Sequence, residues 1–140
     1  MPIESDDGLR DVLGLNTIAV VGASTTPGKA AHDIPRYMER QGYEIVPVNP
    51  YADEVLGTEA YDSLDEVETE IDIVDVFRPS EEVPEIVDDV LARHEDRGDV
   101  EALWLQLDIR HDEATDRAVE AGIDVVQDRC LKVEHQRLLA

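Results

Sequence analysis

The residues best suited to chemistry follow the first apolar run of the chain. Residues 17–21 read TIAVV, and the stretch GASTTPGKA then runs from Gly22 to Ala30. Gly22 lets the backbone turn sharply and approach a ligand, and the helix expected next would point free N–H groups at an anion such as pyrophosphate. Lys29, one of only two lysines, adds a positive charge there. A plain turn with a surface lysine fits equally well, but the pattern makes candidates of Gly22, Ala23, Ser24, Pro27, Gly28, Lys29 and Ala30.

The spacing in this loop differs from that of the common nucleotide-binding loops. Neither G-x-G-x-x-G nor G-x-x-x-x-G-K-[ST] is present. A second apolar run ends in Val48-Asn49-Pro50, where an NAD site usually has Asp or Glu for the ribose hydroxyls. Asn49 can still bond a ribose, but it has no charge. The pattern therefore disfavours NAD, and favours a nucleotide that binds in another position.

Three later segments also carry polar or reactive side chains. Phe77-Arg78-Pro79 offers a ring for stacking and a guanidinium that can pair with phosphate, although a core Phe beside a surface Arg is the simpler interpretation. Gln106 follows the next apolar run. Cys130 is either a reactive thiol beside Arg129 or an inert buried one. None of these residues forms a catalytic set, and we predict a binding site without catalytic residues.

All the candidate side chains lie where strands of one sheet are expected to end. Five short apolar runs alternate with segments of helical spacing, and they lie at residues 17–21, 44–48, 72–77, 102–105 and 124–126. Such runs indicate a parallel sheet covered on both faces. We therefore predict one α/β domain over residues 1–140, a Rossmann-like doubly wound five-stranded parallel sheet with strand order 3-2-1-4-5. Pro47 is awkward in a central strand, so we expect it at the strand's exit.

The helices are predicted from apolar stripes and from their stop signals. They cover residues near 7–13, a segment before Gly42, a long segment from Ser80 to just before Gly98, a segment stopping at Gly122, and residues 132–139. Ser80 is the expected cap of the long helix, and Ser63-Leu-Asp-Glu66 has the form of a capping box. Ligands bind such folds beyond the carboxyl ends of the strands, near the reversal of strand order.

Composition limits the partners and the compartment. The chain has 34 Asp and Glu against 12 Lys and Arg, a net charge of −22, which repels nucleic acid and anionic membranes. An acidic, lysine-poor pattern suggests adaptation to a salt-rich, halophilic cytoplasm, or simply an acidic mesophilic protein. The N-terminus has no apolar signal core, so we expect a cytoplasmic protein. One cysteine and four histidines without H-x-x-x-H spacing predict no metal.

Taken in order, these segments resemble the small stand-alone CoA-binding domain proteins, whose fold also forms the CoA-binding part of the succinyl-CoA synthetase alpha subunit. The similar segments span nearly the whole chain, and they are residues 18–24 (IAVVGAS), 27–30 (PGKA), 42–50 (GYEIVPVNP), 75–79 (DVFRP), 104–106 (WLQ) and 126–130 (VQDRC) through His135. One departure is Asp108, which stands where the family usually has glycine.

The resemblance implies that coenzyme A or an acyl-CoA is the ligand. It implies that the glycine turn and Lys29 hold the CoA phosphates, and that the second and third strand ends flank the adenosine. The catalytic domains of succinyl-CoA synthetase have no counterpart here, so the expected role is that of a binding module. An NAD(P)-dependent oxidoreductase or redox sensor is the alternative. A third alternative is a subunit that binds a protein partner, with the nucleotide merely structural. The partner could also be a second copy of this chain, in a homo-oligomer.

Overall fold

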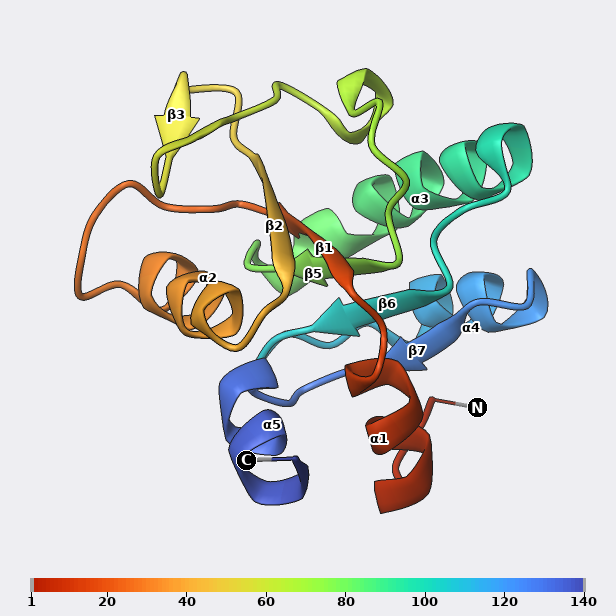
Figure 1. The fold of residues 1–140 in the computed structure, drawn as a ribbon. Coiled ribbons are helices and arrows are strands. Elements are labelled where there is room, and N and C mark those ends of the chain that lie inside the picture. Colours follow the sequence, from red (N-terminus) through yellow and green to blue (C-terminus); the bar gives the residue numbers. More distant parts are fainter. Residues whose placement is uncertain (1, 140) are drawn as a thin grey trace.

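A central parallel sheet lies between two layers of helices in the computed structural model, which describes residues 2–139 (Figure 1). Its strands are β1 (Thr17–Val21), β2 (Glu44–Val48), β5 (Ile73–Val76), β6 (Ala102–Leu105) and β7 (Asp124–Val126). Almost every residue of these strands is buried, because helices cover both faces. This burial explains why the strands read as continuous apolar runs and not as alternating ones. The predicted parallel α/β fold is confirmed.

Each face of the sheet has its own core and its own helices. α1 (Asp6–Leu13), α2 (Ala30–Arg40) and α5 (Leu131–Leu138) cover one face, where Trp104 is fully buried. α3 (Val83–Arg97) and α4 (Asp112–Glu120) cover the other, which is built mainly from Val, Leu and Ile. Two short 3-10 helices, η1 (Leu64–Glu66) and η2 (Ser80–Glu82), precede β5 and α3. None of the helices described is long and apolar enough to cross a membrane.

The predicted strand order 3-2-1-4-5 is wrong. The sheet runs β2-β1-β5-β6-β7. The third predicted strand, which is β5, therefore pairs with β1, and the second predicted strand, β2, lies at an edge of the sheet. The reason is Pro47. Its carbonyl accepts a hydrogen bond from the Tyr61 N–H on the outer side of β2 (3.0 Å). The nitrogen of a strand residue points to the same side as its carbonyl, so the N–H that proline lacks would also point outward. An edge strand has no neighbouring strand on that side, so no ladder bond is lost.

Both edges of the sheet are capped by short backbone contacts. Beyond β2, a small hairpin of β3 (Glu54–Val55) and β4 (Thr58–Glu59) leads to Tyr61, which forms a parallel bridge with Val48. Beyond β7, the Ile3 N–H donates to the Val125 carbonyl (2.7 Å). The hairpin was not predicted, and its turn residues Leu56 and Gly57 both have positive φ.

The predicted helices are present, but two predicted caps are wrong. Ser80 makes no capping bond, because its Oγ accepts the Arg110 N–H (3.0 Å) and α3 begins after η2. Ser63 caps only a 3-10 turn, without a side-chain bond. Its Glu66 partner instead accepts the Asp62 N–H (3.3 Å). The stop signal at Gly98 is confirmed by its φ of +72° after α3.

Candidate functional site

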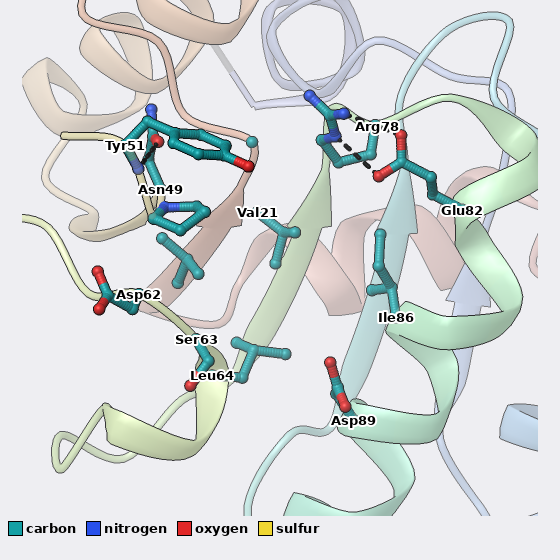
Figure 2. Close-up of a pocket in the computed structure, with 13 residues that line it drawn as sticks. Val21, Asn49, Tyr51, Asp62, Ser63, Leu64, Arg78, Glu82, Ile86 and Asp89 are labelled. Atoms are coloured by element: carbon teal, nitrogen blue, oxygen red, sulfur yellow. Dashed lines mark hydrogen bonds and ion pairs between the residues drawn. The ribbon is translucent and has the colours of Figure 1, made fainter.

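A cavity of about 380 Å³ opens at the carboxyl ends of β1, β2 and β5 (Figure 2). It lies where the strand order reverses, the position at which doubly wound sheets bind ligands. Its volume is in the range of small-molecule sites. The residues that line it are Val21, Gly22, Val48, Asn49, Pro50, Tyr51, Asp62, Ser63, Leu64, Arg78, Glu82, Ile86 and Asp89.

The wall of the cavity is apolar at its base and aromatic at its rim. Val48, Leu64 and Ile86 are buried core residues that also line the cavity. Tyr51 is 96% exposed, and Figure 2 places its ring on the opposite side of the cavity from Arg78. An exposed ring beside an apolar wall can stack on a planar base.

Arg78 is held at the site by Gly22 and Glu82. Gly22 has a φ of +89°, and a Cβ there would lie 2.8 Å from Arg78 Cδ, so the glycine makes room for the arginine stem. The guanidinium donates through Nε to Glu82 Oε1 (3.2 Å) and through Nη2 to Glu82 Oε2 (2.9 Å). The hydrogen bond to Glu82 raises the pKa of Arg78 above its usual value.

Asn49 has a positioning role in the structure. Its Nδ2 donates to the Ala23 carbonyl and its Oδ1 accepts the Tyr51 N–H, both at 2.8 Å. The side chain thus joins the ends of β1 and β2 and directs the turn that carries Tyr51. Each end of the amide makes one of its two possible hydrogen bonds, so one N–H and one lone pair of Asn49 remain for the expected bond to a ribose.

A carboxylate nevertheless lies close to the end of β2. The bridge between Val48 and Tyr61 brings the next residue, Asp62, to the cavity. Asp62 could not be predicted from apolar periodicity, because it follows a hairpin that has none. The other lining residues that were not predicted are Val21, Tyr51, Ser63, Leu64, Glu82, Ile86 and Asp89. Of these, Tyr51 had a signal, since an aromatic residue directly after Asn49-Pro50 sits at a predicted strand end.

A buried arginine fixes the wall that carries Leu64. Arg93 Nη1 donates to the Leu64 and Val67 carbonyls at 2.6 and 2.7 Å, and Nη2 donates to Asp99 at 2.9 Å. The side chains of this pair are 1% and 5% exposed. Because a buried charge is stable only when it is paired and hydrogen-bonded, Arg93 ties α3 firmly to this side of the cavity.

The glycine loop lies outside the cavity, except for Gly22. Pro27, Gly28, Lys29 and Ala30 are exposed and do not line it. Lys29 forms no ion pair within residues 2–139. The N–H groups of Ala30 and Ala31 at the start of α2 have no acceptor in that part of the chain. These groups remain available to an anion.

Asp33 competes for the same end of the helix. Its Oδ1 accepts from His32 Nδ1 (2.8 Å) and from the Gly28 N–H (3.2 Å). The His32 hydrogen bond, with the Gly28 N–H, lowers the pKa of Asp33 below its usual value. Ser24 Oγ accepts the Thr26 N–H (3.0 Å) and so shapes the loop.

The remaining predicted residues are separated from the cavity. Ala23 is buried, Phe77 packs against the core on the α2 side, and Pro79 is exposed beside the site without lining it. Cys130 lines a second cavity of about 420 Å³ beside Arg129, at the start of α5. The structure thus brings Gly22, Val48, Asn49, Pro50 and Arg78 together and leaves the other predicted residues elsewhere.

Gln106 belongs to a buried polar network. Its Nε2 donates to Asp75 Oδ1 (2.7 Å), and its Oε1 accepts the Leu131 N–H at the start of α5 (3.3 Å). Asp75 is 1% exposed, and its Oδ2 has no hydrogen-bond partner in the described chain. Burial raises the pKa of Asp75 to about 7, against the opposing effect of the Gln106 bond. Asp75 and Gln106 thereby couple the middle of the sheet to α5.

Asp108 retains the backbone shape that glycine would give. Its φ is +70°, in the left-handed region that Asp tolerates better than most residues. Its N–H donates to Asp128 Oδ1 (2.7 Å). Asp108 therefore adopts a φ that glycine would also adopt without strain.

The chain belongs to the CoA-binding domain family, whose model matches residues 16–136. A Bacillus subtilis (strain 168) protein, YneT, is 42% identical over 118 residues, which are 84% of each chain. ADP-forming acetate–CoA ligase II from Archaeoglobus fulgidus is 36% identical over 81 residues, which are 56% of this chain and 12% of the ligase. The resemblance to CoA-binding proteins is confirmed.

Solved structures agree with this assignment. A Thermus thermophilus protein has a TM-score of 0.89 and 44% identity, with 97% of this chain and 100% of that one covered. A protein from Pyrococcus horikoshii OT3 has a TM-score of 0.91 and 34% identity, with 100% and 97% covered. The chain is thus similar to small proteins over their full length, and to a small part of a large ligase.

Proposed function

We propose that this protein binds coenzyme A or an acyl-CoA in the cytoplasm. The adenosine lies in the cavity between β1, β2 and β5, and the phosphates extend toward the start of α2. The observation that carries the proposal is a cavity at the reversal of strand order in a chain of the CoA-binding domain family. Arg78 at the cavity and the free N–H groups of Ala30 and Ala31 beyond it supply two places for phosphate.

The test is calorimetric titration with CoA and acetyl-CoA, in wild type and in Tyr51→Ala. Tyr51 is almost fully exposed, so its loss should leave the fold unchanged while removing a stacking surface. We expect affinity to fall about tenfold, as in other base–aromatic contacts. Leu107→Ala is the matched control, because Leu107 is exposed but lies outside this cavity. Wild-type affinity in Tyr51→Ala would place the adenine elsewhere.

A second candidate ligand is NAD(H), and Asp62 is the observation that favours it. Its carboxylate lies near the end of β2, where NAD sites place an acid for the ribose hydroxyls. NAD(H) in the same titration separates the two candidates. Tighter binding of NAD(H) than of CoA, lost in Asp62→Asn, would favour the dinucleotide.

A further inference from the structure

The cavity contains an arginine that is already engaged by a carboxylate. Among the described residues that line it, Arg78 is the one basic side chain, against the acids Asp62, Glu82 and Asp89. Glu82 takes two hydrogen bonds from the guanidinium. A ligand phosphate that approaches Arg78 therefore meets a protein carboxylate in the place where the phosphate would bind.

The geometry makes this pair exchangeable. The Arg78 stem passes close to Gly22, and the arginine lines the cavity, where its head can meet either anion. The side chains of Arg78 and Glu82 are 48% and 41% exposed, and ion pairs at such positions are weak. Two guanidinium N–H groups suit a phosphate as well as a carboxylate. Figure 2 shows Glu82 beside Arg78, on the segment that leads into α3.

We propose that Glu82 is an internal substitute for the ligand's phosphate, holding Arg78 until the ribose 3′-phosphate of CoA displaces it. This inference rests on the proposed function. The 3′-phosphate is the group assigned to Arg78 because it is attached to the ribose of the adenosine placed in the cavity. The pyrophosphate, one linkage further out, is placed at the start of α2.

Glu82 then sets how strongly the protein distinguishes CoA from dephospho-CoA. Before binding it keeps Arg78 occupied, and after displacement its charge still repels the dianionic phosphate. Both effects lower the affinity for CoA. Neither applies to dephospho-CoA, which has no group to exchange with Glu82.

The experiment measures the affinity of wild type, Glu82→Gln and Glu81→Gln for CoA and dephospho-CoA by calorimetry at low salt. Glu81→Gln is the control, because Glu81 is exposed on the same 3-10 turn and lies outside the cavity. Its substitution changes the net charge by the same amount as Glu82→Gln. We expect Glu82→Gln to bind CoA about two- to fivefold more tightly, which is the strength of an exposed ion pair. Dephospho-CoA should bind wild type and Glu82→Gln equally.

Each other outcome counts against the inference. Equal gains for both ligands, or an equal gain in Glu81→Gln, would reduce Glu82 to one surface charge among many. An unchanged or weaker CoA affinity in Glu82→Gln would refute its role as a competitor, although CoA binding itself would stand. If none of the three proteins binds either ligand, the proposed function fails and this inference fails with it.

Discussion

Lys29 carries a positive charge at the start of α2 with no ion-pair partner in the described chain, next to the two free N–H groups of Ala30 and Ala31. We predict that Lys29→Ala weakens CoA binding about three- to tenfold, a range set by its solvent exposure. Because the lysine is assigned to the pyrophosphate, dephospho-CoA should lose affinity by the same factor. Titrations of both ligands check this.

The control for Lys29→Ala is Lys132→Ala, which removes the other lysine of the chain at a position outside the cavity. Wild-type affinity in Lys29→Ala would exclude any role for the residue. An effect seen with CoA but absent with dephospho-CoA would instead move Lys29 to the 3′-phosphate.

Asp75 should make the free energy of unfolding depend on pH. Its pKa in the folded protein is about 7, raised from an ordinary 3.8, so the folded state binds the proton more tightly than the unfolded state does. The stabilisation from the protonated acid is complete below about pH 4, and it is lost as the pH rises through about 7. Asp75→Asn, which cannot ionise, should lack this loss. The difference should reach the order of a few kcal/mol at pH 8.

The measurement for Asp75 is the free energy of unfolding of both proteins by urea between about pH 4 and pH 8. Only the difference between the two curves is informative, because many other carboxylates titrate in both proteins. Parallel curves would show that Asp75 ionises in the fold at its ordinary pKa.

The strands and helices were predictable from the sequence, and their arrangement was only partly so. Fully apolar runs identify buried strands, and Gly98 with its positive φ ends α3 where expected. The strand order failed although Pro47 carried the information, because a missing N–H is harmless only at an edge. Residues 49–63 were not predictable from periodicity, since the hairpin there is held by backbone contacts with β2. This segment brings Tyr51 and Asp62 to the site.

The loop after β6 contains Asp108, whose backbone conformation should limit which residues fit there without strain. Asp108 is exposed and has a φ of +70°, so a β-branched residue there should be strained while glycine should not. We predict that Asp108→Val lowers the free energy of unfolding by about 1–2 kcal/mol. Asp108→Gly, which also removes the side chain and its charge, should stay within about 0.5 kcal/mol of wild type or exceed it. Equal losses in both variants would assign the effect to the side chain.

The net charge of −22 governs how the stability of the protein responds to salt. Screening of like charges should stabilise the fold. It should also strengthen binding of anionic CoA to a cavity lined by three acids and one arginine. We therefore predict that the melting temperature and the CoA affinity both rise as KCl increases from about 0.1 M. Sucrose is the control, since it does not screen charge, and flat responses to KCl would contradict the salt-adapted interpretation.

The edges of the sheet are partly covered, and this limits how copies of this chain can associate. Pro47 offers no donor on the outer side of β2 and its carbonyl is taken by Tyr61, while the carbonyl of Val125 in β7 is taken by Ile3. A free edge is what allows one sheet to continue into another or to seed a fibril. Any self-association is therefore expected to use side-chain surfaces, and it should leave the strand pairing of each copy unchanged.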